Sequence, residues 1–175
     1  MIPNTLKTLL LATMIGTIAG GNSAAQTPRV DAQTAFNLLK TLEGSWTAQH
    51  GPGKTATSRF ELTANGTVLV EHYVNPAIPG GQMMNAYHLD GQDLVLTHYC
   101  VARNQPTLRA ERFDAATSEM QFEFLRATNL VTLDAGHMRR AKYRVIDRNT
   151  FVTEWEFFDK GIKTLTEVES FTRVK

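Results

Sequence analysis

Hydrophobic and polar residues alternate along most of the chain after residue 44. Between 119 and 127, Met120, Phe122 and Phe124 occupy every second position, and acidic or amide side chains lie between them. A period of two places the apolar side chains on one face of a strand and the polar ones on the other. The pattern predicts strands near 44–50, 56–64, 67–75, 82–89, 92–102, 106–113, 119–127, 138–147, 150–159 and 162–174.

Short turn segments separate these predicted strands. Asn65-Gly66 and Asp90-Gly91 lie between apolar runs, and both positions of a type I′ hairpin turn need the positive φ that Asn, Asp and Gly tolerate. Regularly spaced strands joined by hairpins are typical of an antiparallel barrel or sandwich. We expect an all-β protein with a single antiparallel up-and-down barrel of eight to ten strands. Residues 128–137 form a longer crossing with room for one helical turn.

One segment before the strands has a helical pattern instead. In residues 32–42, Phe36 and Leu39 lie on neighbouring turns of an apolar face. Asp31 is the expected N-cap, and Gly44 is the expected stop signal. A helix of this length is marginal in isolation. We therefore expect this short N-terminal helix to dock beside one end of the barrel.

The first residues have the features of a secretory signal peptide. Lys7 is the only charge before an apolar run at 9–19, which is too short to span a bilayer comfortably. Ser23-Ala24-Ala25 resembles a cleavage site. We expect cleavage after Ala25, leaving a signal peptide at 1–25 and a barrel domain at 26–175, and hence an exported protein that is periplasmic or extracellular. The alternative is a membrane anchor that is never removed.

Charge and cysteine content narrow the range of partners. The chain has 18 basic and 17 acidic residues, and Lys7 is the only charge before residue 26, so the mature protein has no net formal charge. We expect no binding to nucleic acid and, after signal removal, none to a membrane.

Cys100 is the only cysteine, which excludes an internal disulfide. Its thiol is buried, metal-bound or paired with another chain, and burial is the simplest interpretation; the oligomeric state stays open.

A short motif at the start of the first strand resembles a known signature. Gly44-Ser45-Trp46 follows the predicted helix, and a Gly-x-Trp at this point resembles the signature of the lipocalins and the wider calycin superfamily. The resemblance implies that Trp46 closes one end of the barrel and that a basic side chain near the end of the last strand packs on it. Arg173 is placed for that role, since a guanidinium can stack on indole and also bond to nearby carbonyls.

Three segments in the middle of the chain resemble a narrower group. Residues 87–91 (Tyr-His-Leu-Asp-Gly), 96–100 (Leu-Thr-His-Tyr-Cys) and 104–106 (Asn-Gln-Pro) are similar to a family of exported bacterial lipocalin-like proteins without an established activity. That resemblance implies the fold and export but no reaction. The chain also loosely resembles nitrobindins, which are small heme-binding barrels. Residues 150–174 contain no histidine to match their late-strand heme ligand, so we expect no heme and no other cofactor.

The second hairpin turn predicts which side chains of its strands face the interior. The predicted pairs are Leu89 with Gln92, Tyr87 with Leu94, Asn85 with Leu96 and Met83 with His98. If Leu94 and Leu96 are inside, Tyr87, Asn85, His98 and Cys100 form a half-polar patch in the interior. A register error of one residue would reverse the faces of one strand.

The first hairpin turn places an acidic residue in the interior as well. A two-residue turn at Asn65-Gly66 pairs Phe60 with Glu71. If Phe60 is inside, Glu71 is inside too, and a buried carboxylate needs a partner. Candidate partners are His98, Tyr87 and Arg109.

These placements give the candidate site residues. The candidate ligand-binding residues are Tyr87, Asn85, His98, Cys100, Phe122 and Trp155. The best catalytic candidates are His98, Glu71 and Tyr87, because interior polar pairs have shifted pKa values and can perform acid–base chemistry. Each residue also has a structural explanation, as a hydrogen-bonded buried histidine, an inert buried thiol or a core aromatic.

The remaining histidines and the possible metal ligands offer no clear site. His98 and Cys100 share a predicted face, but no spacing elsewhere completes the three or four ligands that a metal needs. We therefore expect no metal site. The other histidines are most simply surface residues, namely His50, His72, His88 and His137.

Three functional hypotheses remain open. The first is an exported barrel that binds a small, mostly apolar molecule, which requires an interior cavity. The second is an acid–base enzyme of the isomerase or hydrolase type, with His98 as base and Glu71 or Tyr87 assisting. It requires Glu71 and His98 to converge on one cavity.

The third hypothesis is an envelope interaction protein without a ligand. It is motivated by Tyr99, Val101 and Tyr73 as outward-facing residues on adjoining strands. An exposed apolar patch of that kind would be typical of a protein–protein contact.

Overall fold

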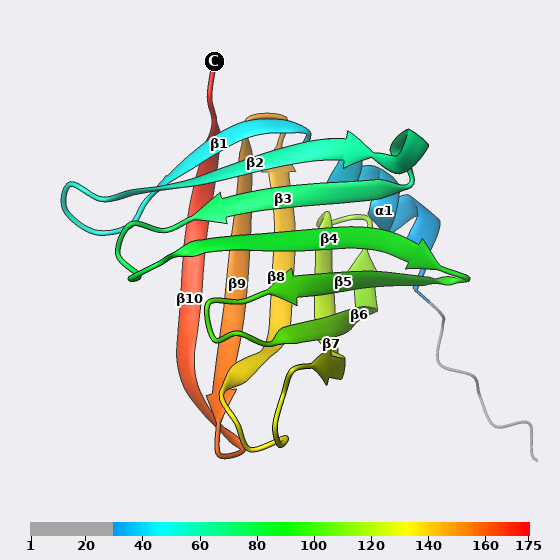
Figure 1. Ribbon diagram of the computed structural model, residues 1–175. Coiled ribbons are helices and arrows are strands. Elements are labelled where there is room, and N and C mark those ends of the chain that lie inside the picture. The colour runs from blue at the N-terminus through cyan, green and yellow to red at the C-terminus, as the bar shows by residue number, and fades with distance from the viewer. Residues whose placement is uncertain (1–29) are drawn as a thin grey trace, which may run out of the picture.

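The computed structural model describes residues 30–175, which form one short helix and ten strands (Figure 1). The helix is α1 (Ala32–Lys40). The strands are β1 (Gly44–Gln49), β2 (Thr55–Thr63), β3 (Val68–Val74), β4 (Gln82–Asp90), β5 (Asp93–Tyr99), β6 (Gln105–Asp114), β7 (Glu119–Thr128), β8 (His137–Asp147), β9 (Thr150–Asp159) and β10 (Ile162–Arg173). The expected signal peptide at 1–25 lies outside the described residues.

The ten strands close into a single antiparallel barrel. Each strand pairs with its neighbours in the chain, and β1 closes the sheet by pairing with β10. This confirms the predicted up-and-down barrel, and it is compatible with a lipocalin-like fold. The crossing between β7 and β8 contains no helical turn within the described residues; a reverse turn is closed there by a hydrogen bond from Ala135 N to Thr132 O (3.1 Å).

The hairpin registers confirm the predicted faces, although one predicted register is wrong. In β2–β3 the pair Phe60 with Glu71 forms as predicted. In β4–β5, Asn85 lies opposite His98, so the register differs from the prediction by two residues. The reason is the turn: Gly91 has a φ of 62° and precedes a residue with negative φ, as in a type II′ turn at 91–92. A shift of two preserves every inward face.

The helix covers one end of the barrel. Asp31 caps α1, because its carboxylate accepts a hydrogen bond from Thr34 N (3.0 Å). Phe36 and Leu39 are buried on the face toward the barrel, and α1 contacts β4, β5 and β6. The helix ends at Lys40, before the predicted end at 42. Among the described residues, no helix combines the length and the apolar character that a membrane span requires.

Trp46 and Arg173 close the barrel as the resemblance implied. The Arg173 guanidinium lies 4.0 Å from the centroid of the Trp46 ring. The same guanidinium donates to the carbonyl oxygens of Thr41 (2.8 Å), Glu43 (2.7 Å) and Arg148 (2.8 Å). One side chain thus joins the segment after α1, the β8–β9 turn and β10.

Aromatic rings fill the interior next to this closure. The Phe151 ring lies edge-on to Trp46 (4.8 Å between centroids) and stacks on Phe171 (4.8 Å). Phe60 packs against Phe151 from the opposite wall (5.7 Å). The helix end of the barrel is therefore solid, and free space is left toward the other end.

We predict that Arg173→Ala lowers the free energy of unfolding by about 2–4 kcal/mol, because it removes the ring contact and leaves three carbonyls without their donor. Arg173→Lys should recover only part of this loss, since one ammonium cannot replace the guanidinium fork. Chemical denaturation checks both values. Arg126→Ala, at an exposed position on β7, is the matched control, and an Arg173→Ala loss no larger than that of this control would contradict the closure.

Candidate functional site

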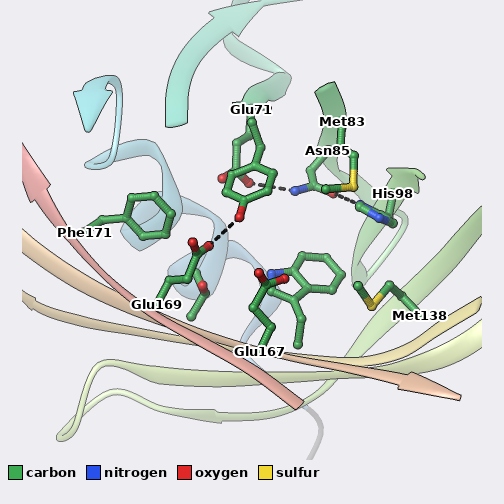
Figure 2. Close-up of a pocket in the computed structure, with 11 residues that line it drawn as sticks. Glu71, Met83, Asn85, His98, Met138, Glu167, Glu169 and Phe171 are labelled. Atoms are coloured by element: carbon green, nitrogen blue, oxygen red, sulfur yellow. Dashed lines mark hydrogen bonds between the residues drawn. The ribbon is translucent and has the colours of Figure 1, made fainter. Parts of the chain in front are cut away.

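A small cavity lies in the barrel on the side away from α1 (Figure 2). Its apolar wall is formed by Met83, Met138, Trp155 and Phe171. Its polar lining includes Glu71, Tyr73, Asn85, His98, Thr153, Glu167 and Glu169. The cavity volume is ≈ 20 Å³, which is room for about one water-sized group. A cavity large enough for a whole ligand, as the binding hypothesis requires, is therefore not present in this conformation.

Glu71 is the centre of a buried hydrogen-bond network. Glu71 is 2% exposed, and its carboxylate accepts hydrogen bonds from Ser58 (2.6 Å), Asn85 (2.8 Å) and Tyr87 (2.6 Å). The Tyr143 hydroxyl lies 3.2 Å from the same carboxylate and 2.6 Å from the Tyr87 hydroxyl, so its single hydrogen is shared between these two acceptors. Burial, followed by the charge of Glu71, raises the pKa of both tyrosines well above the ordinary value. The hydroxyls therefore stay protonated as donors. Ser58, Asn85, Tyr87 and the more distant Tyr143 together compensate a buried carboxylate for which no lysine or arginine partner is found among residues 30–175.

The predicted partners of Glu71 are only partly correct. Tyr87 is a direct partner. Arg109 is not, because it lies at the surface and pairs with Glu111 (2.6 Å). The prediction also missed Tyr143, whose strand β8 meets β3 only across the barrel interior. Ser58 shares the inward face of β2 with Phe60, so strand alternation would have identified it.

Asn85 connects Glu71 to His98. The amide nitrogen of Asn85 donates to the Glu71 carboxylate (2.8 Å), so its carbonyl oxygen faces Nδ1 of His98 (2.7 Å). An amide oxygen only accepts, so this network assigns the proton of His98 to Nδ1 and a lone pair to Nε2. Burial lowers the pKa of His98 to about 4. His98 is consequently a neutral imidazole at pH 7, and its ring lies 5.0 Å from that of Trp155.

Nε2 of His98 is a buried acceptor without a partner. The residue is 4% exposed, and among the described residues no donor reaches this nitrogen. A buried polar atom without a hydrogen bond costs about 1–3 kcal/mol, so such atoms call for an explanation. Because His98 lines the cavity, a donor that entered the cavity could satisfy Nε2.

The other predicted ligand-binding residues lie in different places. Asn85, His98 and Trp155 line the cavity, whereas Tyr87, Phe122 and Cys100 do not. Phe122 is fully buried and packs edge-on against the Tyr87 ring (6.5 Å). Cys100 follows the end of β5 and packs half-buried against the core. Burial raises the pKa of its thiol, which agrees with an unreactive cysteine.

Several predicted surface positions are wrong. His137 is 1% exposed, because its ring packs against Phe124 (4.9 Å) and its Nδ1 lies 2.6 Å from Ala135 O. His50 is half-buried among acidic residues. Tyr73 points into the barrel, because β3 places it on the same face as Glu71. The outward patch proposed for an interaction protein is therefore reduced to Tyr99 and Val101, which are exposed.

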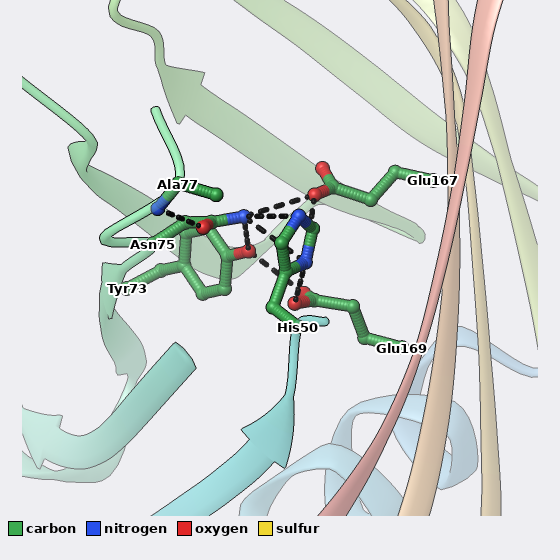
Figure 3. A network of polar contacts seen from close by, with 6 residues as sticks. All are labelled: His50, Tyr73, Asn75, Ala77, Glu167 and Glu169. Atoms are coloured by element: carbon green, nitrogen blue, oxygen red, sulfur yellow. Dashed lines mark hydrogen bonds and ion pairs between the residues drawn. The ribbon is translucent and has the colours of Figure 1, made fainter. Parts of the chain in front are cut away.

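A second polar group lies at the edge of the cavity, and no local sequence pattern predicted it (Figure 3). Tyr73 donates to Glu169 (2.8 Å), and the Asn75 amide donates to Glu167 (3.0 Å). Burial raises the pKa of both glutamates. Ligand atoms of Glu167, Glu169 and His50 all lie within 4.8 Å of one another, although no converging set of metal ligands was expected.

We predict that Glu71→Gln lowers the free energy of unfolding by about 3 kcal/mol. The amide nitrogen of the new glutamine would point its hydrogens at hydroxyl and amide groups that now donate to the carboxylate. The buried side chain would also lose hydrogen bonds to a charged acceptor. Urea denaturation measures the loss. Glu61→Gln, at a half-exposed surface site, is the matched control and should change stability by less than about 0.5 kcal/mol. Equal effects of the two variants would contradict the network.

We also predict a pH dependence that is specific to His98. Its pKa of about 4 in the folded protein lies below the unfolded value of about 6.5. The contribution of His98 to the free energy of unfolding is therefore complete above pH 6.5 and is lost as the pH falls through 4. Relative to His98→Gln, the native protein should lose roughly 3 kcal/mol over that range. Imidazole NMR should show an Nδ1–H tautomer. A pKa near 6.5, or a proton on Nε2, would contradict the relay.

Comparisons with known proteins add no function to this geometry. The chain matches no protein-family model, and no curated protein matches it significantly. Any functional inference therefore rests on the cavity, the Glu71–Asn85–His98 relay and the acidic group at the cavity edge.

Proposed function

We propose that this protein is an exported barrel that binds a small, mostly apolar molecule through a hydrogen-bond donor directed at Nε2 of His98. The observation that carries the proposal is the buried lone pair on Nε2 of His98, which has no partner in the described chain and belongs to a residue that lines a cavity. An N–H or O–H group of a ligand would supply the missing hydrogen bond. The relay through Asn85 holds the ring in the tautomer that accepts such a donor.

The cavity lining supports a ligand with a donor head and an apolar body. Three of its side chains are carboxylic acids, namely Glu71, Glu167 and Glu169, and no lysine or arginine of the described chain lines it. Met83, Met138 and Trp155 supply apolar contact surface. A donor group therefore finds acceptors in this cavity, and an acidic ligand would be repelled.

The small volume of the cavity requires the methionines to move. Sites for small molecules usually exceed about 300 Å³, whereas this cavity has ≈ 20 Å³. Met83 and Met138 lie in its wall, and methionine changes its shape more readily than any branched side chain. In the proposed complex the donor group enters first, and these two side chains rotate away to admit the apolar body.

Acid–base catalysis is the second candidate function. Glu71 and His98 line one cavity and are joined through Asn85, which is the arrangement expected of an oriented base. Tyr87 would act only through Glu71, since it does not line the cavity. However, a base with a pKa of about 4 is poorly matched to proton abstraction near pH 7. Binding is therefore the better-supported function.

Native mass spectrometry of protein purified from its own cellular compartment tests the proposal. We expect a small molecule to copurify with the native protein, and His98→Leu to reduce its occupancy at least about tenfold, since one hydrogen bond to a buried acceptor is worth that factor. His88→Leu, at a half-buried position on the neighbouring strand, should retain the molecule. Protein without any adduct, or an adduct that His98→Leu retains in full, would contradict the proposal.

A further inference from the structure

Three side chains with metal-binding atoms meet at the edge of the barrel cavity (Figure 3). His50 directly follows β1, while Glu167 and Glu169 are two residues apart on β10. Residues at i and i+2 of a strand point to the same side, so both carboxylates face inward. The closure of β1 against β10 brings the imidazole to them across 119 residues of sequence.

The distances within this group fit a single small cation. Nδ1 of His50 lies 3.2 Å from Oε1 of Glu169 and 3.6 Å from Oε1 of Glu167. Nitrogen and oxygen ligands bind Zn²⁺ at about 2.0–2.2 Å in tetrahedral geometry, which places neighbouring ligand atoms roughly 3.4 Å apart. Both distances from His50 are thus close to the spacing of a metal-bound set, and the ligand atoms of all three side chains lie within 4.8 Å of one another.

The group has more negative charge and more acceptors than its neighbours compensate. Among residues 30–175, neither carboxylate pairs with a lysine or arginine, and His50 is their only ion-pair partner. The Asn75 amide nitrogen lies within 3.4 Å of both His50 nitrogens, the Tyr73 hydroxyl and Glu167, yet it has only two hydrogens. A bound cation would neutralise the two carboxylates, and it would also bind the lone pairs that now have no hydrogen-bond donor.

A separate observation points to a ligand in the same cavity. Glu167 and Glu169 line the cavity together with His98, as Figure 2 shows. Nε2 of His98 is more than nine-tenths buried and has no partner in the described chain. A metal ion keeps water in its open positions, and metal-bound water is a strong donor. Water on an ion at the cavity edge would therefore be a donor of the kind that Nε2 of His98 lacks, as an alternative to the N–H or O–H group of the small molecule proposed above.

We propose that His50, Glu167 and Glu169 bind one divalent transition-metal ion at the cavity edge, with Zn²⁺ as the best-matched species. One imidazole and two carboxylates are ligands that zinc accepts, with the fourth position left to water. Ca²⁺ takes six to eight oxygens, and Mg²⁺ needs an octahedral oxygen shell, which this group does not offer. Tyr73 and Asn75 would act as positioning residues, because they hydrogen-bond to the carboxylates and so orient them.

Calorimetric titration with ZnCl₂ tests the proposal on protein purified from cells that express the full chain without a histidine tag. After treatment with a chelator, we expect one Zn²⁺ per chain and no comparable binding of Mg²⁺. His50→Ala and Glu167→Gln should each weaken zinc binding at least about tenfold, because each removes a direct ligand. His72→Ala is the matched control, since His72 is an exposed histidine that pairs with the single acidic residue Glu61 (3.8 Å), and it should bind zinc like the native protein.

Further measurements separate loss of the site from loss of the fold and from the function proposed above. Far-UV circular dichroism must show an intact barrel in each variant, and His50→Gln replaces His50→Ala if the latter unfolds. Bound Co²⁺ should give the visible spectrum of a four- or five-coordinate ion, which His50→Gln should abolish. His98→Leu should keep the zinc stoichiometry of one. No zinc binding by the native protein, or unchanged affinity in folded His50 and Glu167 variants, would overturn the metal site.

Discussion

The buried carboxylate of Glu71 determines the arrangement of the polar interior of this barrel. A charge in that position is tolerated only if it is fully hydrogen-bonded, and the hydroxyl and amide groups around it come from β2, β4 and β8. Because these strands belong to different walls, one acidic side chain constrains the interior from several sides. It also orients Asn85, and through Asn85 it determines which nitrogen of His98 is free.

One end of the barrel is packed for stability, and the other has the features of a binding site. At the end covered by α1, aromatic rings and the Arg173 guanidinium fill the space. Beyond Glu71 the interior changes to methionines, glutamates and His98, and a cavity is left among them. A binding site needs both free volume and unsatisfied polar atoms, and only the second region offers both. The packed aromatic end stabilises the fold, and this stability offsets the free-energy cost of burying the polar groups at the other end.

The sequence predicted the ten strands, the helix and the inward faces because these depend on local pattern. Alternation is so strong a constraint that a two-residue error in the β4–β5 register left Asn85 and His98 on the correct face. The contacts of Glu71 with Tyr143, and of Glu169 with His50, could not be predicted in this way. These contacts depend on which side chains meet across the closed barrel. Hairpin geometry and periodicity predict neighbours on strands joined by a hairpin, but not the distance between side chains on strands that are far apart in the sequence.

His98 in the cavity and His50 at its edge show how burial and the distance to a carboxylate together decide the chemistry of an imidazole. His98 is separated from Glu71 by one amide, so it receives orientation without a direct ion pair. Burial then dominates and keeps its ring neutral. His50 is less buried and lies directly against Glu167 and Glu169. At His98, burial thus gives a neutral ring and the Glu71–Asn85 pair orients its free nitrogen toward a donor. At His50, two carboxylates in direct contact give a group with the ligand atoms that a cation needs.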